Sequence, residues 1–182
     1  LTKLGEVAGG DYKLAQKYFN YGIGVMVAVL DTGLSSDLSK AGGELERAIA
    51  KDFTNSSTGT EDVHGHSSHV TCHIGGKTIG LAPRCELRVG KVLGDTGSGS
   101  SIGIRDGIQW AVDEFKKSTT AETLIISMSL GSSQNSTTIH NAVKEAVKTP
   151  GVIILASQGN SGGSNGPGQT PTERGGFPGS NP

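Results

Sequence analysis

Three residues of this chain carry side chains that could take part in one hydrolytic reaction, although they lie far apart in the sequence. Asp31 ends the apolar run of Val-Ala-Val-Leu-Asp-Thr-Gly, and His66 begins a segment of small residues that predicts a helix. A carboxylate that accepts a hydrogen bond from an imidazole fixes the tautomer whose other ring nitrogen can take a proton. Asn160 follows a second apolar run, and its amide could donate a hydrogen bond to a developing oxyanion.

Two of these residues also have a simpler interpretation. Asp-Thr-Gly at residues 31–33 is good turn chemistry, so Asp31 could be a turn or helix-capping acid. Gly159 and Asn160 could likewise form an ordinary loop turn. The presence of all three residues favours the catalytic interpretation, because a turn acid alone requires neither a histidine nor an amide elsewhere.

The histidine lies in a cluster that also allows a metal hypothesis. Spacings of three, four and seven residues put His66, His69 and His73 on one helical face, with His64 and Cys72 nearby. Imidazole and thiolate are ligands that zinc prefers in proteins. A zinc or other transition-metal site is therefore an alternative function for this segment.

The pattern of apolar runs predicts the elements that position these residues. Short runs over residues 25–30, 87–93, 124–128 and 152–156 predict buried strands. Apolar stripes at helical spacing over residues 101–115 and 139–147 predict helices that face a core. This alternation favours βαβ units and a parallel sheet covered on both faces. Ligands bind such a sheet at the carboxyl ends of its strands, where Asp31, Gly94 and Asn160 fall.

Several motifs stand in the order, and at nearly the spacing, of one known family. They are Val-Ala-Val-Leu-Asp-Thr-Gly ending at residue 33, Gly-His-x-x-His-Val at 65–70, Leu-Ala-Pro at 81–83, Lys-Val-Leu-Gly at 91–94, Gly-Ser-Gly at 97–99, Met-Ser-Leu-Gly at 128–131 and Gly-Asn at 159–160. Over residues 22–182 the chain resembles the subtilisin-like serine proteases, whose triad runs Asp, His, Ser along the sequence.

The resemblance implies a fold and an activity. The fold would be α/β, a subtilisin-like open and mostly parallel sheet with helices on both faces, and incomplete. Residues 1–182 would form the N-terminal and central part of one peptidase domain. The activity would be that of a serine endopeptidase, with Asp31 and His66 in its Asp-His-Ser triad and Asn160 as oxyanion donor.

The nucleophile of that triad is not assigned in this chain. The family's nucleophile lies in a Gly-Thr-Ser-Met-Ala motif, which none of the serines after residue 160 matches: Ser161, Ser164 and Ser180. We therefore expect a truncated or nicked protease chain that lacks its nucleophile-bearing part and is inactive alone.

The resemblance also implies where a peptide substrate would bind. Three segments correspond to the family's two substrate-clamping edges and to its pocket for the side chain before the scissile bond: Gly97, Ser98 and Gly99, then Ser129, Leu130 and Gly131, then Ser157, Gln158 and Gly159. The alternative interpretation is ordinary loop sequence rich in Gly and Ser.

No metal site and no organic cofactor are predicted. The segment at residues 74–79 is shorter than the loop that forms the family's tight calcium site, so calcium is not predicted there. Oxygen-rich loops such as residues 161–172 leave weaker calcium sites open, without a specific position.

Composition and family together indicate the partners. The net charge of −1 argues against nucleic acid or an anionic membrane, and no apolar run is long enough to span a bilayer. The expected partners are protein or peptide substrates and an inhibitory propeptide, and a secreted location is favoured on family grounds. Cys72 and Cys85 could be free or paired.

Two further function classes stand beside the protease. A non-catalytic relative or fragment would keep the fold and act as an interaction module. An aspartic protease would use Asp-Thr-Gly directly, but that class needs two such acids on an all-β scaffold, and this sequence holds one Asp-Thr-Gly and a βαβ pattern.

Overall fold

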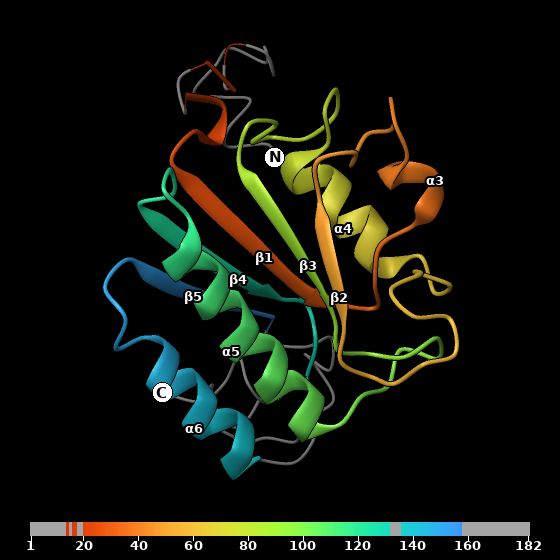
Figure 1. Cartoon of the computed structure of the whole chain (residues 1–182), viewed down its shortest axis with the longest axis vertical. Coiled ribbons are helices and arrows are strands. Elements are labelled where there is room, and N and C mark those ends of the chain that lie inside the picture. The colour runs from red at the N-terminus through yellow and green to blue at the C-terminus, as the bar shows by residue number, and fades with distance from the viewer. Residues whose placement is uncertain (1–13, 15, 18–19, 132–135, 158–182) are drawn as a thin grey trace, which may run out of the picture.

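The structure is a computed structural model that describes residues 14, 16–17, 20–131 and 136–157 (Figure 1). Its centre is a five-stranded sheet in the order β2-β3-β1-β4-β5. The strands are β1 (Val25–Asp31), β2 (Ile49–Asp52), β3 (Glu86–Lys91), β4 (Thr123–Met128) and β5 (Val152–Ala156). Every neighbouring pair of strands is parallel, which confirms the predicted α/β architecture.

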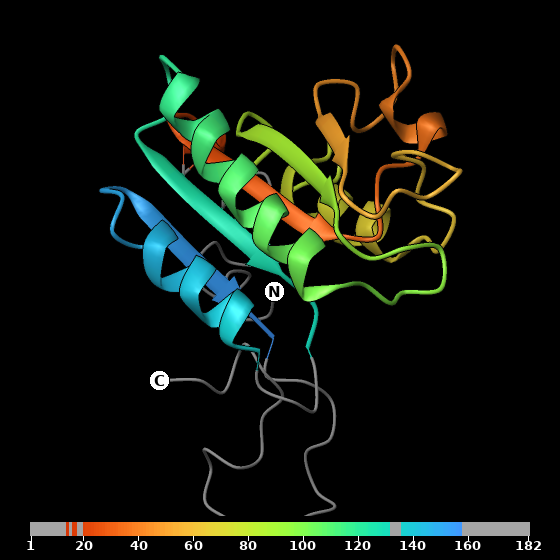
Figure 2. The same cartoon turned by 60° about the horizontal axis from the view of Figure 1, so that its bottom comes forward.

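Helices lie on both faces of the sheet. The helices α5 (Ser101–Lys117) and α6 (Thr137–Ala146) run side by side along one face (Figure 2). The helix α4 (His66–Gly75) packs on the other face, and the chain also forms the short helix α3 (Ser36–Ser39) and the 3₁₀ turn η1 (Asn20–Gly22). Among the described helices, none is long and apolar enough to cross a membrane.

The central strand β1 is buried because its side chains alternate between two hydrophobic clusters. Met26, Ala28 and Leu30 pack in the cluster formed with α5 and α6. Val27 and Val29 pack in the cluster that contains residues of α4 and β3. Burial on both faces explains why this strand is a continuous apolar run in the sequence rather than an alternating one.

The two helices of the first face begin at the caps that their sequences provide. The Ser100 hydroxyl accepts a hydrogen bond from the Gly103 amide at 3.0 Å, and the Ser136 hydroxyl caps α6 through the Ile139 amide. The expected apolar stripe of α6 is wrong at one position. Val147 is 50% exposed, although its amide still donates to the Val143 carbonyl as in the helix.

Two strand expectations also need correction. The strand expected over residues 87–93 ends at Lys91, because the amides of Val92 and Leu93 both donate to the Asp31 carbonyl and leave the ladder. The edge strand β2 was not expected at all. Its sequence, Ile-Ala-Lys-Asp, is too short and too polar to stand out, and no residue in it is fully buried.

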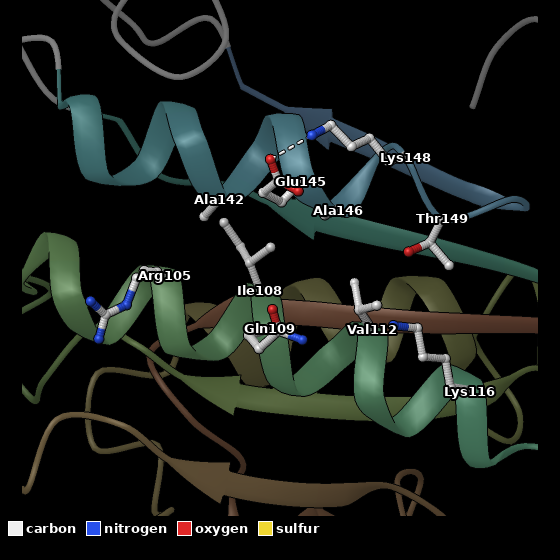
Figure 3. A pocket seen from close by; sticks show the side chains of 10 residues that line it. All are labelled: Arg105, Ile108, Gln109, Val112, Lys116, Ala142, Glu145, Ala146, Lys148 and Thr149. Atoms are coloured by element: carbon white, nitrogen blue, oxygen red, sulfur yellow. Dashed lines mark hydrogen bonds and ion pairs between the residues drawn. The ribbon is translucent and has the colours of Figure 1, made fainter.

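A groove runs between α5 and α6 on the outer side of that helical layer (Figure 3). Its lining mixes apolar and charged side chains: Ile108, Val112, Lys116, Ala142 and Lys148. It contains none of the residues that the sequence nominates for chemistry. The candidate site must instead be sought where the parallel strands end.

Candidate active site

Asp31 and His66 form a hydrogen-bonded pair, as the sequence predicts. The Nδ1 atom of His66 lies 2.8 Å from Oδ1 and 2.9 Å from Oδ2 of Asp31. A carboxylate only accepts, so Nδ1 is the donor and carries the hydrogen. The Asp31 side chain is fully buried, whereas that of His66 is 40% exposed. The imidazole is therefore held by its inner nitrogen and open to a reactant at its outer nitrogen.

The end of β1 fixes the aspartate. Its carboxylate also accepts a hydrogen bond from the Thr32 amide at 2.7 Å. The next residue, Gly33, has φ of +123°, and a Cβ there would lie 2.6 Å from the Thr60 carbonyl oxygen. Glycine is needed at this turn for both its conformation and its lack of a side chain.

The first turn of α4 fixes the histidine. Gly65 precedes the helix in a left-handed conformation and has no side chain with which to cap it. Asp62 supplies the cap instead, since its Oδ1 accepts from the Gly65 amide at 2.9 Å and its Oδ2 accepts from the Ser68 amide at 2.7 Å. The free amides of the first turn are thus satisfied by a carboxylate from the preceding loop.

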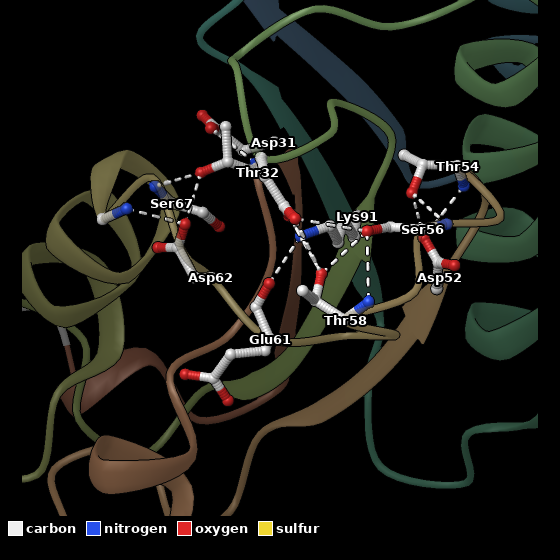
Figure 4. Close-up of polar contacts among 12 residues, drawn as sticks. Asp31, Thr32, Asp52, Thr54, Ser56, Thr58, Glu61, Asp62, Ser67 and Lys91 are labelled. Atoms are coloured by element: carbon white, nitrogen blue, oxygen red, sulfur yellow. Dashed lines mark hydrogen bonds and ion pairs between the residues drawn. The ribbon is translucent and has the colours of Figure 1, made fainter.

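Thr32 ties this cap to the end of β1. Its hydroxyl donates to Asp62 Oδ1 at 2.7 Å and accepts from the Ser67 amide at 3.0 Å (Figure 4). One threonine next to Asp31 therefore holds the helix turn that carries His66. Sequence reasoning missed both Thr32 and Asp62, although an aspartate shortly before a helix is a recognisable capping signal.

The electrostatics of the cap favour an ionised Asp62. Burial raises the pKa of its carboxyl, but hydrogen bonds from Ser68, Thr32 and Gly65 lower it by more, so the pKa lies below its ordinary value. The negative charge sits at the N-terminus of α4, where the helix dipole also favours it. The N-terminus of α4 is thus capped by an ionised carboxylate.

The segment expected to bind substrate at residues 97–99 lies beside the histidine. Its first two residues belong to a tight turn, in which the Gly94 amide donates to the Ser98 carbonyl and the Gly97 amide donates to the Gly94 carbonyl. A Cβ at Gly97 would lie 3.1 Å from His64 Nε2, so the His64 ring packs against this turn. The same ring stands edge-on to the His66 ring, with centroids 6.2 Å apart.

The other expected substrate segments are described only in part. Residues 129–131 directly follow β4, and the Ser157 amide donates to the Met128 carbonyl at 3.1 Å. The Ser157 hydroxyl donates to the Leu130 carbonyl at 3.3 Å, so the ends of β4 and β5 lie together. Gln158, Gly159 and Asn160 lie outside the described residues, and their expected roles stay predictions.

The metal alternative does not assemble in the described part of the chain, where no group of three or more His, Cys, Asp or Glu side chains could hold an ion. The side chains of the proposed metal cluster contact different partners. His66 faces Asp31, Cys72 is buried in the core, and the rings of His69 and His73 pack on each other with centroids 4.4 Å apart.

Both cysteines are free and buried. Burial raises the pKa of the Cys72 thiol and raises that of Cys85 to about 11. Neither is therefore a thiolate near neutral pH, and neither is an activated nucleophile.

The fold and the site together define a class of protein. It is an α/β protein in which a buried aspartate at the carboxyl end of a parallel strand orients a half-exposed histidine, the arrangement used in catalytic triads. The model of the subtilase family matches residues 22–181. The chain belongs to the subtilase family.

Individual relatives agree with this assignment. The chain is 38% identical to alkaline elastase YaB of Bacillus sp. (strain YaB) over 159 residues, covering 84% of this chain and 38% of that protein. It is 38% identical to subtilisin Savinase of Lederbergia lenta over 148 residues, covering 78% of this chain and 49% of that protein. Half or less of each of these two relatives is therefore represented here.

Solved structures give the same result. Sphericase matches with a TM-score of 0.66 and 38% identity, covering 79% of this chain and 48% of the other. A cold-adapted subtilisin-like serine proteinase matches with a TM-score of 0.63 and 31% identity, covering 77% of this chain and 48% of the other. The expected subtilisin-like fold is confirmed by these likenesses.

Proposed function

We propose that this chain is part of a serine endopeptidase that hydrolyses peptide bonds through an Asp-His-Ser triad. The observation that carries the proposal is the pair of His66 Nδ1 and the buried Asp31 carboxylate, with the opposite side of the ring open. Family membership supplies the context. Because the chain spans half or less of the relatives named above, the nucleophile is proposed to lie in sequence that corresponds to their remaining part.

The proposed mechanism uses the two described residues in fixed roles. Asp31 holds the ring in the tautomer that leaves Nε2 as an acceptor. His66 then takes the proton of the serine hydroxyl as its oxygen attacks the carbonyl carbon, and later returns that proton to the leaving amine. Asn160 is proposed to donate a hydrogen bond to the oxyanion formed in between.

The proposed substrate is an extended peptide segment of a protein. Residues 97–99 would pair with it on one side and residues 129–131 on the other, through backbone hydrogen bonds. Residues 157–159 would line the pocket for the side chain before the scissile bond. An inhibitory propeptide, a secreted location and weak calcium binding outside the described residues stay proposals on family grounds.

The aspartic protease alternative is wrong. That chemistry needs two facing carboxylates on an all-β scaffold, whereas Asp31 is bonded to an imidazole at the end of a parallel sheet. No observation specifically favours the interaction-module alternative. A domain that only binds a partner would not require a buried carboxylate hydrogen-bonded to an exposed histidine.

The proposal is tested in the full-length protein that contains this chain. His66→Ala should lower kcat on a peptide substrate by about 10⁶, a magnitude taken from subtilisin, a relative, and not from the present geometry. His69→Ala is the control, since this exposed histidine on the same helix faces His73 instead. A phosphonate that labels active-site serines should modify one serine of the native protein. Retained turnover in His66→Ala would rule the proposal out.

A further inference from the structure

Lys91 is the largest fully buried side chain in the described part of the molecule, and the proposed mechanism does not use it. It is the last residue of β3 and stands next to Asp31 in the register of the sheet. A lysine is rarely buried completely unless its ammonium group is paired, because loss of hydration is costly. Its partners should therefore indicate why it is there.

The ammonium group joins two different loops. Lys91 Nζ donates to the Glu61 carbonyl oxygen at 2.5 Å and to Asp95 Oδ1 at 2.6 Å (Figure 4). Thr58 completes the cluster, since its hydroxyl donates to Asp95 Oδ1 at 2.9 Å. The hydrogen bond from Lys91, and after it that from Thr58, holds the pKa of the Asp95 carboxyl below its ordinary value. The hydrogen bonds thus favour an ionised Asp95, and the cluster joins residues 54–62 to residues 94–98.

The first of these loops leads to the histidine. The Glu61 carbonyl held by Lys91 belongs to the peptide that joins Glu61 to Asp62. Asp62 then caps the first turn of α4, which carries His66. The position of this peptide therefore sets the position of the cap.

The second loop leads to the expected substrate edge. Asp95 lies inside the turn closed by the hydrogen bond from the Gly94 amide to the Ser98 carbonyl, and this turn includes the first two residues of the segment 97–99. The two loops meet again where His64 packs against Gly97. Lys91 and Asp95 thus connect the loop that leads to His66 with the loop that leads to residues 97–99.

We propose that Lys91 and Asp95 are positioning residues, which fix the substrate edge at residues 97–99 relative to His66. The proposal rests on the proposed function, because it assigns residues 97–99 to an extended substrate. Reaction rates depend steeply on such placement, and a misplacement of about 1 Å can cost about 10²-fold. A substrate that does not reach the edge should be insensitive to it.

The test compares two substrates in the full-length protein. One is a peptide with four residues before the scissile bond, and the other is an ester of a single blocked amino acid. In Asp95→Asn and in Lys91→Met, kcat/KM should fall at least about 10-fold for the long peptide, with less than about a 3-fold change for the ester. Lys51→Met is the control, since that lysine lies on the neighbouring strand with an exposed side chain.

The outcomes separate this proposal from the proposed function. If the wild-type protein cleaves neither substrate, the proposed function and the positioning role both fail. If the wild-type protein cleaves both substrates, and the variants lose kcat/KM equally on both substrates or on neither, only the positioning role is wrong. Asp95→Asn keeps an oxygen acceptor for the buried ammonium, so it provides the test if Lys91→Met does not fold.

Hydrogen exchange gives a second readout that needs no activity. The Gly94 and Gly97 amides are bonded within the turn that Asp95 holds. In Asp95→Asn they should exchange at least about 10-fold faster, while the β1 amides keep their protection, because only the local opening free energy changes. Unchanged exchange at both glycines would overturn the proposal.

Discussion

Strands β1 and β5 belong to one sheet but differ in how that sheet is covered. Val27 and Val29 of β1 are buried on the α4 face. Through β4, these residues align with Ile153 and Leu155 of β5, which lie on the same face and are 49% and 56% exposed. The helix α6 covers only the opposite face of β5, where Val152 and Ile154 pack.

The difference shows what the histidine helix does besides carrying a side chain. The helix α4 packs on β1 and β3, and it does not cover Ile153 and Leu155 of β5. The aspartate therefore ends a strand that is covered on both faces, and the histidine begins the helix that covers one of them. A site that needs an alignment within tenths of an ångström benefits from that position.

The largest expected effect is in the covered strand. Leu30→Ala should lower the free energy of unfolding of this chain by about 2–5 kcal/mol, because the leucine is fully buried and its loss leaves a cavity. Urea unfolding measures the change. A loss below about 1 kcal/mol would mean that the surroundings of β1 collapse easily, and the contrast with β5 would weaken.

A smaller effect is expected where α4 is attached. Asp62→Asn should cost about 0.5–2 kcal/mol at neutral pH, because one cap oxygen is replaced by an amide nitrogen that cannot accept. The control is Asp37→Asn, whose side chain is 87% exposed and should change stability by less than about 0.5 kcal/mol.

The loss caused by Asp62→Asn should also depend on pH. The folded pKa of Asp62 is below its unfolded value, so its contribution is complete above the unfolded value. That contribution is lost as the pH falls from about 3.9 through the lower folded value. Wild-type protein should therefore lose more stability on acidification than Asp62→Asn. Parallel pH profiles for the two proteins would contradict an ionised cap.

The smallest effect is expected on the exposed face of β5. Leu155→Ala makes the same chemical change as Leu30→Ala, but at a side chain that is 56% exposed. Its cost in this chain should stay within about 0.5 kcal/mol by urea unfolding. A loss as large as that of Leu30→Ala would show that the face is covered in solution, and the two strands would no longer differ.

Much of the sheet could be predicted from the sequence because its inner strands are buried on both faces. Strands of that kind are continuous apolar runs, so β1 and β4 stand out, as does most of β3. The edge strand β5 is equally apolar in sequence, although Ile153 and Leu155 are exposed on one of its faces. The edge strand β2 escapes the same argument, since Lys51 and Asp52 interrupt it and its neighbours cover it only in part. Its existence depends on pairing with β3, which no local pattern encodes.

The site was predictable to a different degree. The contact between Asp31 and His66 follows from the resemblance to a family, because spacing along the chain does not determine which distant residues meet. Lys91 stands out in the sequence only as part of the Lys-Val-Leu-Gly motif, and charged residues are ordinarily expected at the surface. Its burial depends on Asp95 and on a carbonyl group from another loop, which only the tertiary structure brings together.

The order of strands also governs how the chain can assemble. Among the described strands, β1 comes first along the chain, yet it pairs with β3 and β4, so Met26 can pair only after Glu86 on one side and Leu124 on the other have been synthesised. Contacts between such distant segments form slowly, since a long loop must close before any pairing stabilises it. Until then this apolar strand keeps two unpaired edges, each of which is a template for association with another chain. The strand that later carries Asp31 is therefore an aggregation hazard while the protein is being made.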